Sequence, residues 1–292
     1  MICLFCKENS SLSKSVEHIV PEALGNKSER HNLPKGVVCD KCNNYFASSV
    51  EGPLLSHESF RNLRARYQTP NKKGKMPFWK GDLFGTEFQV GLRLDKKTNT
   101  PEIRPERESQ HEEIERFRRF NDLTGAPTLL RFSNEFIPPE KAMSRFLAKM
   151  AFEAICRRFI LGMNYLECLE ILHTDHYDSI REYARFGYSY EKWPFHYRQY
   201  FPEETLMKHP ETSEWVQFGF GYDLLLTKVP ETYLVFSIHG HEFAINLGGP
   251  KVVGYENWLE ENNGISYLVE ARGARVIESA LSGKLQSYLY NG

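Results

Sequence analysis

The chain has 292 residues, of which 41% are hydrophobic and 13% aromatic, enough for one large domain or two ordinary domains with a packed core. Its formal net charge of −1 does not indicate a protein whose surface as a whole attracts nucleic acid. No apolar run approaches the roughly 20 residues of a membrane-spanning helix, and no signal-peptide pattern follows Met1. We therefore expect a cytoplasmic protein without a membrane partner.

Two Cys-x-x-Cys pairs lie near the start of the chain and comprise Cys3, Cys6, Cys39 and Cys42. Two residues between ligands let both sulfurs of a pair turn toward one ion, and two pairs supply four thiolates for a closed tetrahedral site. We predict structural zinc there, and four reduced core cysteines are the alternative. Cys156 and Cys168 are interpreted as core thiols, because a reducing compartment disfavours disulfides.

The segment between the two pairs carries side chains suited to phosphodiester hydrolysis. An imidazole titrates near neutral pH, so His18 is suited to take a proton from water. Beside it, Glu17 can hold a hard divalent cation, and the side-chain carbonyl of Asn43 can add an uncharged oxygen ligand. If a hairpin and a helix pack around the zinc, these two oxygens reach one ion and His18 points at the water.

A short basic strip follows this segment. Residues 61–80 contain three arginines and four lysines but no acidic residue. Such a strip can hold a phosphate backbone even in a protein that is neutral overall, and the alternative is a solvated loop. We weigh the two equally because the strip comes directly after the candidate hydrolytic residues. The side chains predicted to contact nucleic acid are Arg61, Arg64, Arg66, Lys72, Lys73 and Lys75.

The next elements are expected from periodicity and turn residues. A helix should run from Gly52-Pro53 to the turn at Thr69-Pro70. Strands should follow over residues 76–105, with a turn at residues 96–99, and then a charged, solvated helix or connector over 106–122. After Pro138-Pro139, the apolar spacing predicts a helix with one face in the core. On its opposite face, three basic side chains are expected to be solvated: Lys141, Arg145 and Lys149.

The remaining part of the chain is rich in aromatic residues and then in strand signals. Residues 177–201 are interpreted as an irregular segment that packs its own rings, with base stacking as the less favoured alternative. Residues 233–238 and 241–246 are expected to form strands joined by a tight turn at His239-Gly240.

Three segments together resemble the HNH endonucleases, whose core is the ββα-metal fold. They are Glu17-His18-Ile19-Val20-Pro21, Asn32-Leu33-Pro34 and Val38-Cys39-Asp40-Lys41-Cys42-Asn43-Asn44. The branch of this family with two Cys-x-x-Cys pairs binds structural zinc through them. The resemblance implies an α+β chain, with a zinc-stapled ββα-metal module over residues 1–60. A larger mixed α+β domain over 61–292 would serve substrate recognition, sensing or dimerisation.

The resemblance also implies a role for each residue of the site. His18 would be the general base, and Glu17 would be a ligand of the catalytic metal. Asn32 would orient the base and shape the loop, while Asn43 would complete the metal site. The four cysteines would hold zinc for structure only, and the catalytic ion would be Mg²⁺ or Mn²⁺, since hard oxygen ligands suit those ions.

Two departures from the family pattern affect metal affinity and rate. Most relatives have Asp before the base, where this chain has Glu17, and the common final His is replaced by Asn43. Asn44 would take that last position if the register shifted by one residue. His31 is a weaker alternative for the middle position.

The activity implied by the resemblance is hydrolysis of DNA phosphodiester bonds, leaving 5′-phosphate and 3′-hydroxyl ends. A role in restriction or phage defence is expected from the same resemblance. A non-catalytic, zinc-stapled nucleic-acid-binding module is the alternative, and RNA is a further candidate substrate. A homodimer or an activating partner protein is compatible with the sequence.

Overall fold

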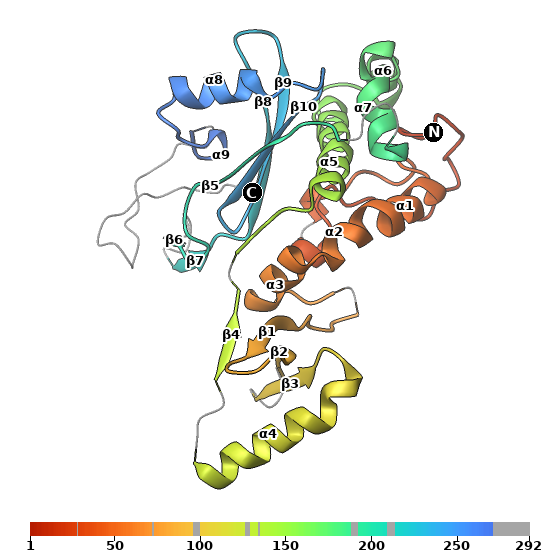
Figure 1. Cartoon of the computed structure of the whole chain (residues 1–292). Coiled ribbons are helices and arrows are strands. Elements are labelled where there is room, and N and C mark those ends of the chain that lie inside the picture. The colour runs from red at the N-terminus through yellow and green to blue at the C-terminus, as the bar shows by residue number, and fades with distance from the viewer. Residues whose placement is uncertain are drawn as a thin grey trace. The chain divides into compact units, whose positions relative to one another are not determined.

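A computed structural model describes residues 1–270, apart from residues 28, 72, 96–99, 126–128, 134, 188–191 and 209–213 (Figure 1). The chain divides into two compact units. The first unit comprises Met1–Pro21, Asn26–Glu51 and Glu140–Gly292, and the second comprises Glu22–Gly25 and Gly52–Pro139. Both units combine helices with antiparallel sheets, which confirms the expected α+β class. Separate roles for residues 1–60 and 61–292 stay a prediction.

The N-terminal part of the first unit contains a long helical segment after the second cysteine pair. Helix α1 (Asp40–Phe46) continues into a π-helical turn, η3 (Ala47–Glu51). Cys39 is the N-cap of α1, because its sulfur accepts a hydrogen bond from the amide of Cys42. The second pair is thereby built into the first turn of the helix. A 3-10 turn, η2 (Glu29–His31), directly precedes Asn32.

The second unit begins with two short helices where one helix was expected. They are α2 (Gly52–Ser56) and α3 (Glu58–Arg66), and the 3-10 turn η1 (Glu22–Leu24) belongs to the same unit. The break lies at His57, whose side chain accepts a hydrogen bond from the Ser59 amide and caps α3. Helix α3 ends before Thr69, as the turn signal predicted.

The second unit also contains an antiparallel sheet with strand order β3-β2-β1-β4. Its strands are β1 (Trp79–Leu83), β2 (Gln89–Leu94), β3 (Pro101–Pro105) and β4 (Leu130–Phe132). The expected strands over 76–105 are therefore confirmed, whereas the turn expected at 96–99 lies outside the described residues. The charged segment forms η4 (Glu108–Gln110) and the mostly exposed helix α4 (His111–Thr124).

A four-stranded antiparallel sheet, ordered β5-β10-β9-β8, forms much of the first unit's core. Its strands are β5 (His196–Gln199), β8 (Phe220–Leu226), β9 (Thr232–Ile238) and β10 (His241–Asn246). The expected β9–β10 hairpin is confirmed. Both turn residues have positive φ, 46° at His239 and 84° at Gly240, and two such residues are what a tight two-residue hairpin turn requires.

Six further elements belong to the first unit. They are α6 (Tyr165–Leu172), α7 (Asp175–Phe186), β6 (Leu206–Lys208), β7 (Trp215–Gln217), α8 (Val253–Glu261) and α9 (Tyr267–Glu270). The aromatic segment 177–201 thus contributes to α7 and β5, which corrects the expectation of an irregular segment. Its Tyr183 and Trp193 are buried in the core, as ring packing predicted, while Tyr188 and Tyr190 lie outside the described residues.

Helix α5 (Glu140–Ile160) lies beside β8, β9 and β10 (Figure 1). The expectation of a solvated basic face on this helix is wrong for Lys149, which is 0% exposed. The reason is that α5 packs against the sheet and also against α7 and η3, so no side of its middle part faces water. Cys156 on α5 and Cys168 on α6 are both buried, as expected for core thiols. None of the described helices is long and apolar enough to cross a lipid bilayer.

Candidate functional site

Four cysteine sulfurs converge at the start of the chain. One ligand atom each from Cys3, Cys6, Cys39 and Cys42 lies within 4.8 Å of the others. The sulfurs of Cys6 and Cys39 are 3.6 Å apart. A tetrahedral zinc ion with bonds of about 2.3 Å holds its sulfurs about 3.8 Å apart, so the donor type and the spacing both fit zinc. The predicted cluster is therefore confirmed as a site that can hold this metal.

Hydrogen bonds, burial and neighbouring charge shift the pKa values of Cys3, Cys6 and Cys42 in different directions. A hydrogen bond from the Cys42 side chain, together with backbone amides, lowers the pKa of Cys3 to about 4. The same bond, burial and the neighbouring sulfurs raise the pKa of Cys42. Burial raises the pKa of Cys6 to about 11. Because four thiolates this close repel one another, all four ionise together only with a cation among them, a charge that a zinc ion would supply.

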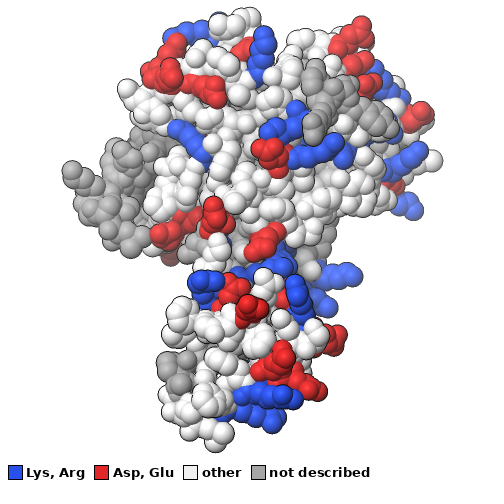
Figure 2. Space-filling model, in the orientation of Figure 1, with Lys and Arg blue, Asp and Glu red and all other residues white. Residues whose placement is uncertain are grey.

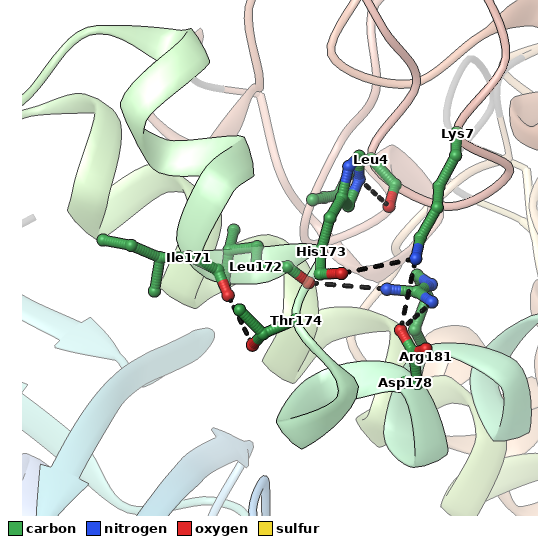
Figure 3. A network of polar contacts seen from close by, with 8 residues as sticks. All are labelled: Leu4, Lys7, Ile171, Leu172, His173, Thr174, Asp178 and Arg181. Atoms are coloured by element: carbon green, nitrogen blue, oxygen red, sulfur yellow. Dashed lines mark hydrogen bonds and ion pairs between the residues drawn. The ribbon is translucent and has the colours of Figure 1, made fainter.

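The first cysteine pair is supported by residues from distant parts of the chain (Figure 3). The ammonium of Lys7 donates to the carbonyl of His173 at 3.3 Å and lies 3.4 Å from Asp178. The His173 ring donates to the carbonyl of Leu4 at 3.2 Å, and burial lowers the pKa of this histidine. Arg181 also pairs with Asp178. The turn between α6 and α7 thus holds the segment that bears Cys3 and Cys6.

The candidate hydrolytic residues lie on a short hairpin. His18 and Asn32 form an isolated antiparallel bridge, and the amide of Leu33 donates to the carbonyl of Glu17 at 2.9 Å. Neighbouring side chains of a strand point to opposite faces. Accordingly, Glu17 is buried at 5% exposure while His18 is half-buried. The structure therefore brings three of the predicted site residues together on two paired segments.

Helix α1 contacts the same hairpin through polar side chains. The amide nitrogen of Asn43 donates to the carbonyl of Val16 at 3.3 Å, next to Glu17 in sequence. At the start of the helix, the Asp40 carboxylate accepts bonds from the hydroxyl and amide of Ser15, at 2.6 and 2.9 Å, which lower the pKa of Asp40. The segment before Glu17 is therefore joined to the first turns of α1, which also bear the second cysteine pair.

The two alternative site positions point elsewhere. Asn44 is exposed, one position further along α1 than Asn43. The His31 ring lies 3.4 Å from the hydroxyl of Tyr222 and packs edge-on against Phe220, so it faces strand β8. The assignment of Asn43 and Asn32 to the site stays a prediction.

A buried charge cluster surrounds Glu17, and sequence reasoning missed it. The ammonium of Lys149 lies 2.6 Å from Glu17, 3.0 Å from Glu51 and 3.1 Å from Glu153. Burial raises the pKa of Glu17 and of Glu153, whereas the three carboxylates raise that of Lys149 despite its burial. The ammonium is thus charged. The sequence feature that could have indicated this cluster is a Lys and a Glu four residues apart within an apolar helical stretch.

Helix α3 presents the basic strip less fully than expected. Arg64 is 8% exposed, and burial lowers its pKa, so this side chain lies inside the second unit and not on a surface strip. Arg61 is partly exposed and lies 3.9 Å from Glu106. Arg66 lies over the ring of Trp79, at 5.8 Å from its centroid.

The lysines of the strip differ from its arginines. Lys73 and Lys75 are exposed, and Lys72 lies outside the described residues. Figure 2 shows basic and acidic side chains interspersed over the face in view, in line with the near-neutral net charge. Contact with a phosphate backbone would therefore be local in this unit, and the strip residues stay a prediction.

Comparison with protein families gives one match, and it covers the site. Residues 3–59 match the family model described as HNH endonuclease. Comparisons with curated proteins and with solved structures find no match. The matched segment begins at the first zinc-site cysteine and contains the hairpin and α1. The match confirms, for residues 3–59, the resemblance to the HNH endonuclease family that the sequence indicated.

Proposed function

We propose that this protein is a divalent-metal-dependent endonuclease that hydrolyses DNA phosphodiester bonds and leaves 5′-phosphate and 3′-hydroxyl ends. The family match supports nuclease activity on DNA. The observation that carries the proposal is the bridge between His18 and Asn32 beside helix α1, next to a four-sulfur cluster suited to zinc. This arrangement puts the imidazole between two backbone hydrogen bonds, from Ile19 to His31 and from Leu33 to Glu17.

His18 is assigned as the general base. Its ring is half-buried, so a water beside it can give up a proton to the imidazole. Asn32 lies directly across the hairpin and holds the His18 backbone through the bridge. A proton moves from the attacking water to the imidazole as the water oxygen attacks phosphorus and the 3′ oxygen leaves.

Glu17 and Asn43 are assigned as ligands of the catalytic ion, Mg²⁺ or Mn²⁺. A carboxylate and an amide carbonyl are hard oxygen donors of the kind these ions prefer. The ion would stabilise negative charge on the scissile phosphate and on the departing oxygen. Because Lys149 already contacts one oxygen of Glu17, metal binding would share this carboxylate with the ammonium.

The other assignments follow the same proposal. The four cysteines hold zinc for structure only, since a closed thiolate site has no position open to substrate. Lys73 and Lys75, with the partly exposed Arg61 and Arg66, would contact the DNA backbone. The rest of the chain would select substrate, sense a signal or form a dimer, in a restriction or phage-defence setting.

Plasmid cleavage tests the proposal. Purified protein is incubated with supercoiled DNA and Mg²⁺, Mn²⁺ or EDTA, and wild type is compared with His18→Ala. His111→Ala is the matched control, because His111 is exposed at the start of α4. We expect metal-dependent cleavage in wild type and control, and its loss in His18→Ala with zinc content unchanged. Cleavage retained by His18→Ala would remove this residue as the base.

A non-catalytic nucleic-acid-binding module is the second candidate. The contact between Glu17 and Lys149 favours it, because an ammonium that neutralises the acid leaves less charge for a metal ion. This candidate predicts DNA binding in a gel-shift assay without cleavage under any metal condition. The same assay with single-stranded DNA and RNA identifies the preferred nucleic acid.

A further inference from the structure

In the C-terminal half of helix α5, Lys149, Glu153 and Arg157 follow one another at intervals of four residues. Residues at this spacing share one face of a helix. The contacts of this face lead to the hairpin more than a hundred residues earlier. The ammonium of Lys149 lies 3.4 Å from the carbonyl oxygen of His18, and the guanidinium of Arg157 donates to the carbonyl of Asn32 at 2.9 Å. These two carbonyls belong to the two residues of the hairpin bridge.

One cation therefore holds each strand of the candidate hydrolytic hairpin. Lys149 also contacts the side chain of Glu17, on the same segment as His18, at 2.6 Å. Glu153 lies between the two cations along the helix and pairs with Lys149 at 3.1 Å. Arg157 is half-buried and lines a cavity of about 360 Å³ together with Asn32 and Lys35. The cavity is open beside the strand residue that Arg157 holds.

A fully buried ammonium is a costly way to achieve stability alone. Taking a charge out of water has a large penalty, and an apolar side chain of similar volume often serves stability equally well. A directed contact with a carboxylate and a carbonyl does what an apolar side chain cannot do, because it fixes the orientation of the acceptor groups. The same helix face has such contacts at both bridge residues, which points to orientation as its role.

We propose that Lys149 and Arg157 are positioning residues of the nuclease centre. Lys149 orients the Glu17 carboxylate and the His18 strand, while Arg157 orients the Asn32 strand. Residues 3–59, the part that matches the family, are then an incomplete site, and α5 completes it. This inference rests on the proposed function for its kinetic consequences, whereas its structural consequences can be measured separately.

The test uses full-length variants. Arg157→Met removes the hydrogen bond to the Asn32 carbonyl. Lys149→Met alone leaves carboxylates buried without their cation. It is therefore accompanied by the double variant Lys149→Met/Glu153→Met, which replaces the ion pair on α5 by two apolar side chains. Arg158→Gln is the matched control on the same helix, because Arg158 is exposed and pairs with Asp223. Zinc content and thermal unfolding establish that each variant is folded.

Three measurements then follow. We expect kcat for DNA cleavage to fall at least tenfold in the Lys149 and Arg157 variants, with KM changed less than twofold. The Mn²⁺ concentration for half-maximal binding should change at least threefold in the Lys149 variants only, because only Lys149 contacts the Glu17 carboxylate. Hydrogen exchange at the amides of Ile19 and Leu33, which close the hairpin, should become faster in all of them.

The results decide whether α5 orients the nuclease centre. Folded variants that match Arg158→Gln in kcat and in amide exchange would overturn the inference. Faster exchange with unchanged kcat and Mn²⁺ binding would also overturn it, since α5 would then support the fold without orienting the site. If wild type cleaves no DNA, the proposed function fails by itself. Amide exchange and Mn²⁺ binding still decide whether α5 holds the hairpin in that case.

Discussion

Replacement of Lys149 by Met should destabilise the first unit strongly, and more so at high pH. The ammonium is 0% exposed and lies 2.6 Å from Glu17, 3.0 Å from Glu51 and 3.1 Å from Glu153. At an effective dielectric constant of about 20, a contact at about 3 Å has a gross attraction of about 5 kcal/mol. The cost of removing these charges from water cancels much of the attraction. Removing one partner of a buried pair typically costs about 3–5 kcal/mol, because the remaining charge is uncompensated.

The pH dependence follows from the carboxyl groups. Burial already raises the pKa of Glu17 and Glu153, and loss of the nearby ammonium should raise both further. An acid whose pKa is higher in the folded than in the unfolded state stabilises the fold at low pH and loses that contribution as pH rises through the folded pKa. Lys149 itself stays protonated across this range, since its pKa is raised. The cost of Lys149→Met should therefore be smaller at pH 6 than at pH 8.

Urea unfolding at both pH values, followed by tryptophan fluorescence, measures this cost. The free energy of unfolding of Lys149→Met is compared with that of wild type at the same pH, so that changes in zinc binding common to both cancel. Lys141→Met on the exposed side of α5 is the control and should cost less than about 0.5 kcal/mol. A cost below about 1 kcal/mol for Lys149→Met at pH 8, or an equal cost at both pH values, would refute the buried charge cluster.

Three further predictions concern the rest of the site. Cys39→Ser should release zinc and unfold the segment around α1, as seen by metal analysis and proteolysis; a folded, zinc-loaded variant would show that the four-sulfur site is misassigned. Asn43→Ala should lower cleavage at least tenfold and weaken Mn²⁺ binding, whereas Asn44→Ala should change neither, and the reverse pattern would shift the register by one residue. If both lysines contact phosphates, Lys73→Gln/Lys75→Gln should weaken DNA binding, measured by fluorescence anisotropy. The slope of the logarithm of the binding constant against the logarithm of the salt concentration should then fall in magnitude by about 2. An unchanged slope would show that these lysines are solvated loop residues.

Several features could be predicted from the sequence because they depend on neighbouring residues. The spacing within Cys3 to Cys6 and Cys39 to Cys42 brings two sulfurs of each pair to one point, whatever the rest of the fold does. The turn at His239-Gly240 and the helix after Pro138-Pro139 likewise follow from local backbone preferences and periodicity. The family resemblance draws on the same short-range patterns, and the match to residues 3–59 confirms it.

Tertiary structure decided which charges lie inside. Periodicity shows one apolar face of α5, but it does not show that the opposite face is also covered, so Lys149 was expected in water. Its contact with the carbonyl of His18 joins residues 131 positions apart. The burial of Arg64 on α3 is a second example. Whether a charged side chain is solvated depends on what packs against its helix, and that is a property of the assembled fold that no local spacing encodes.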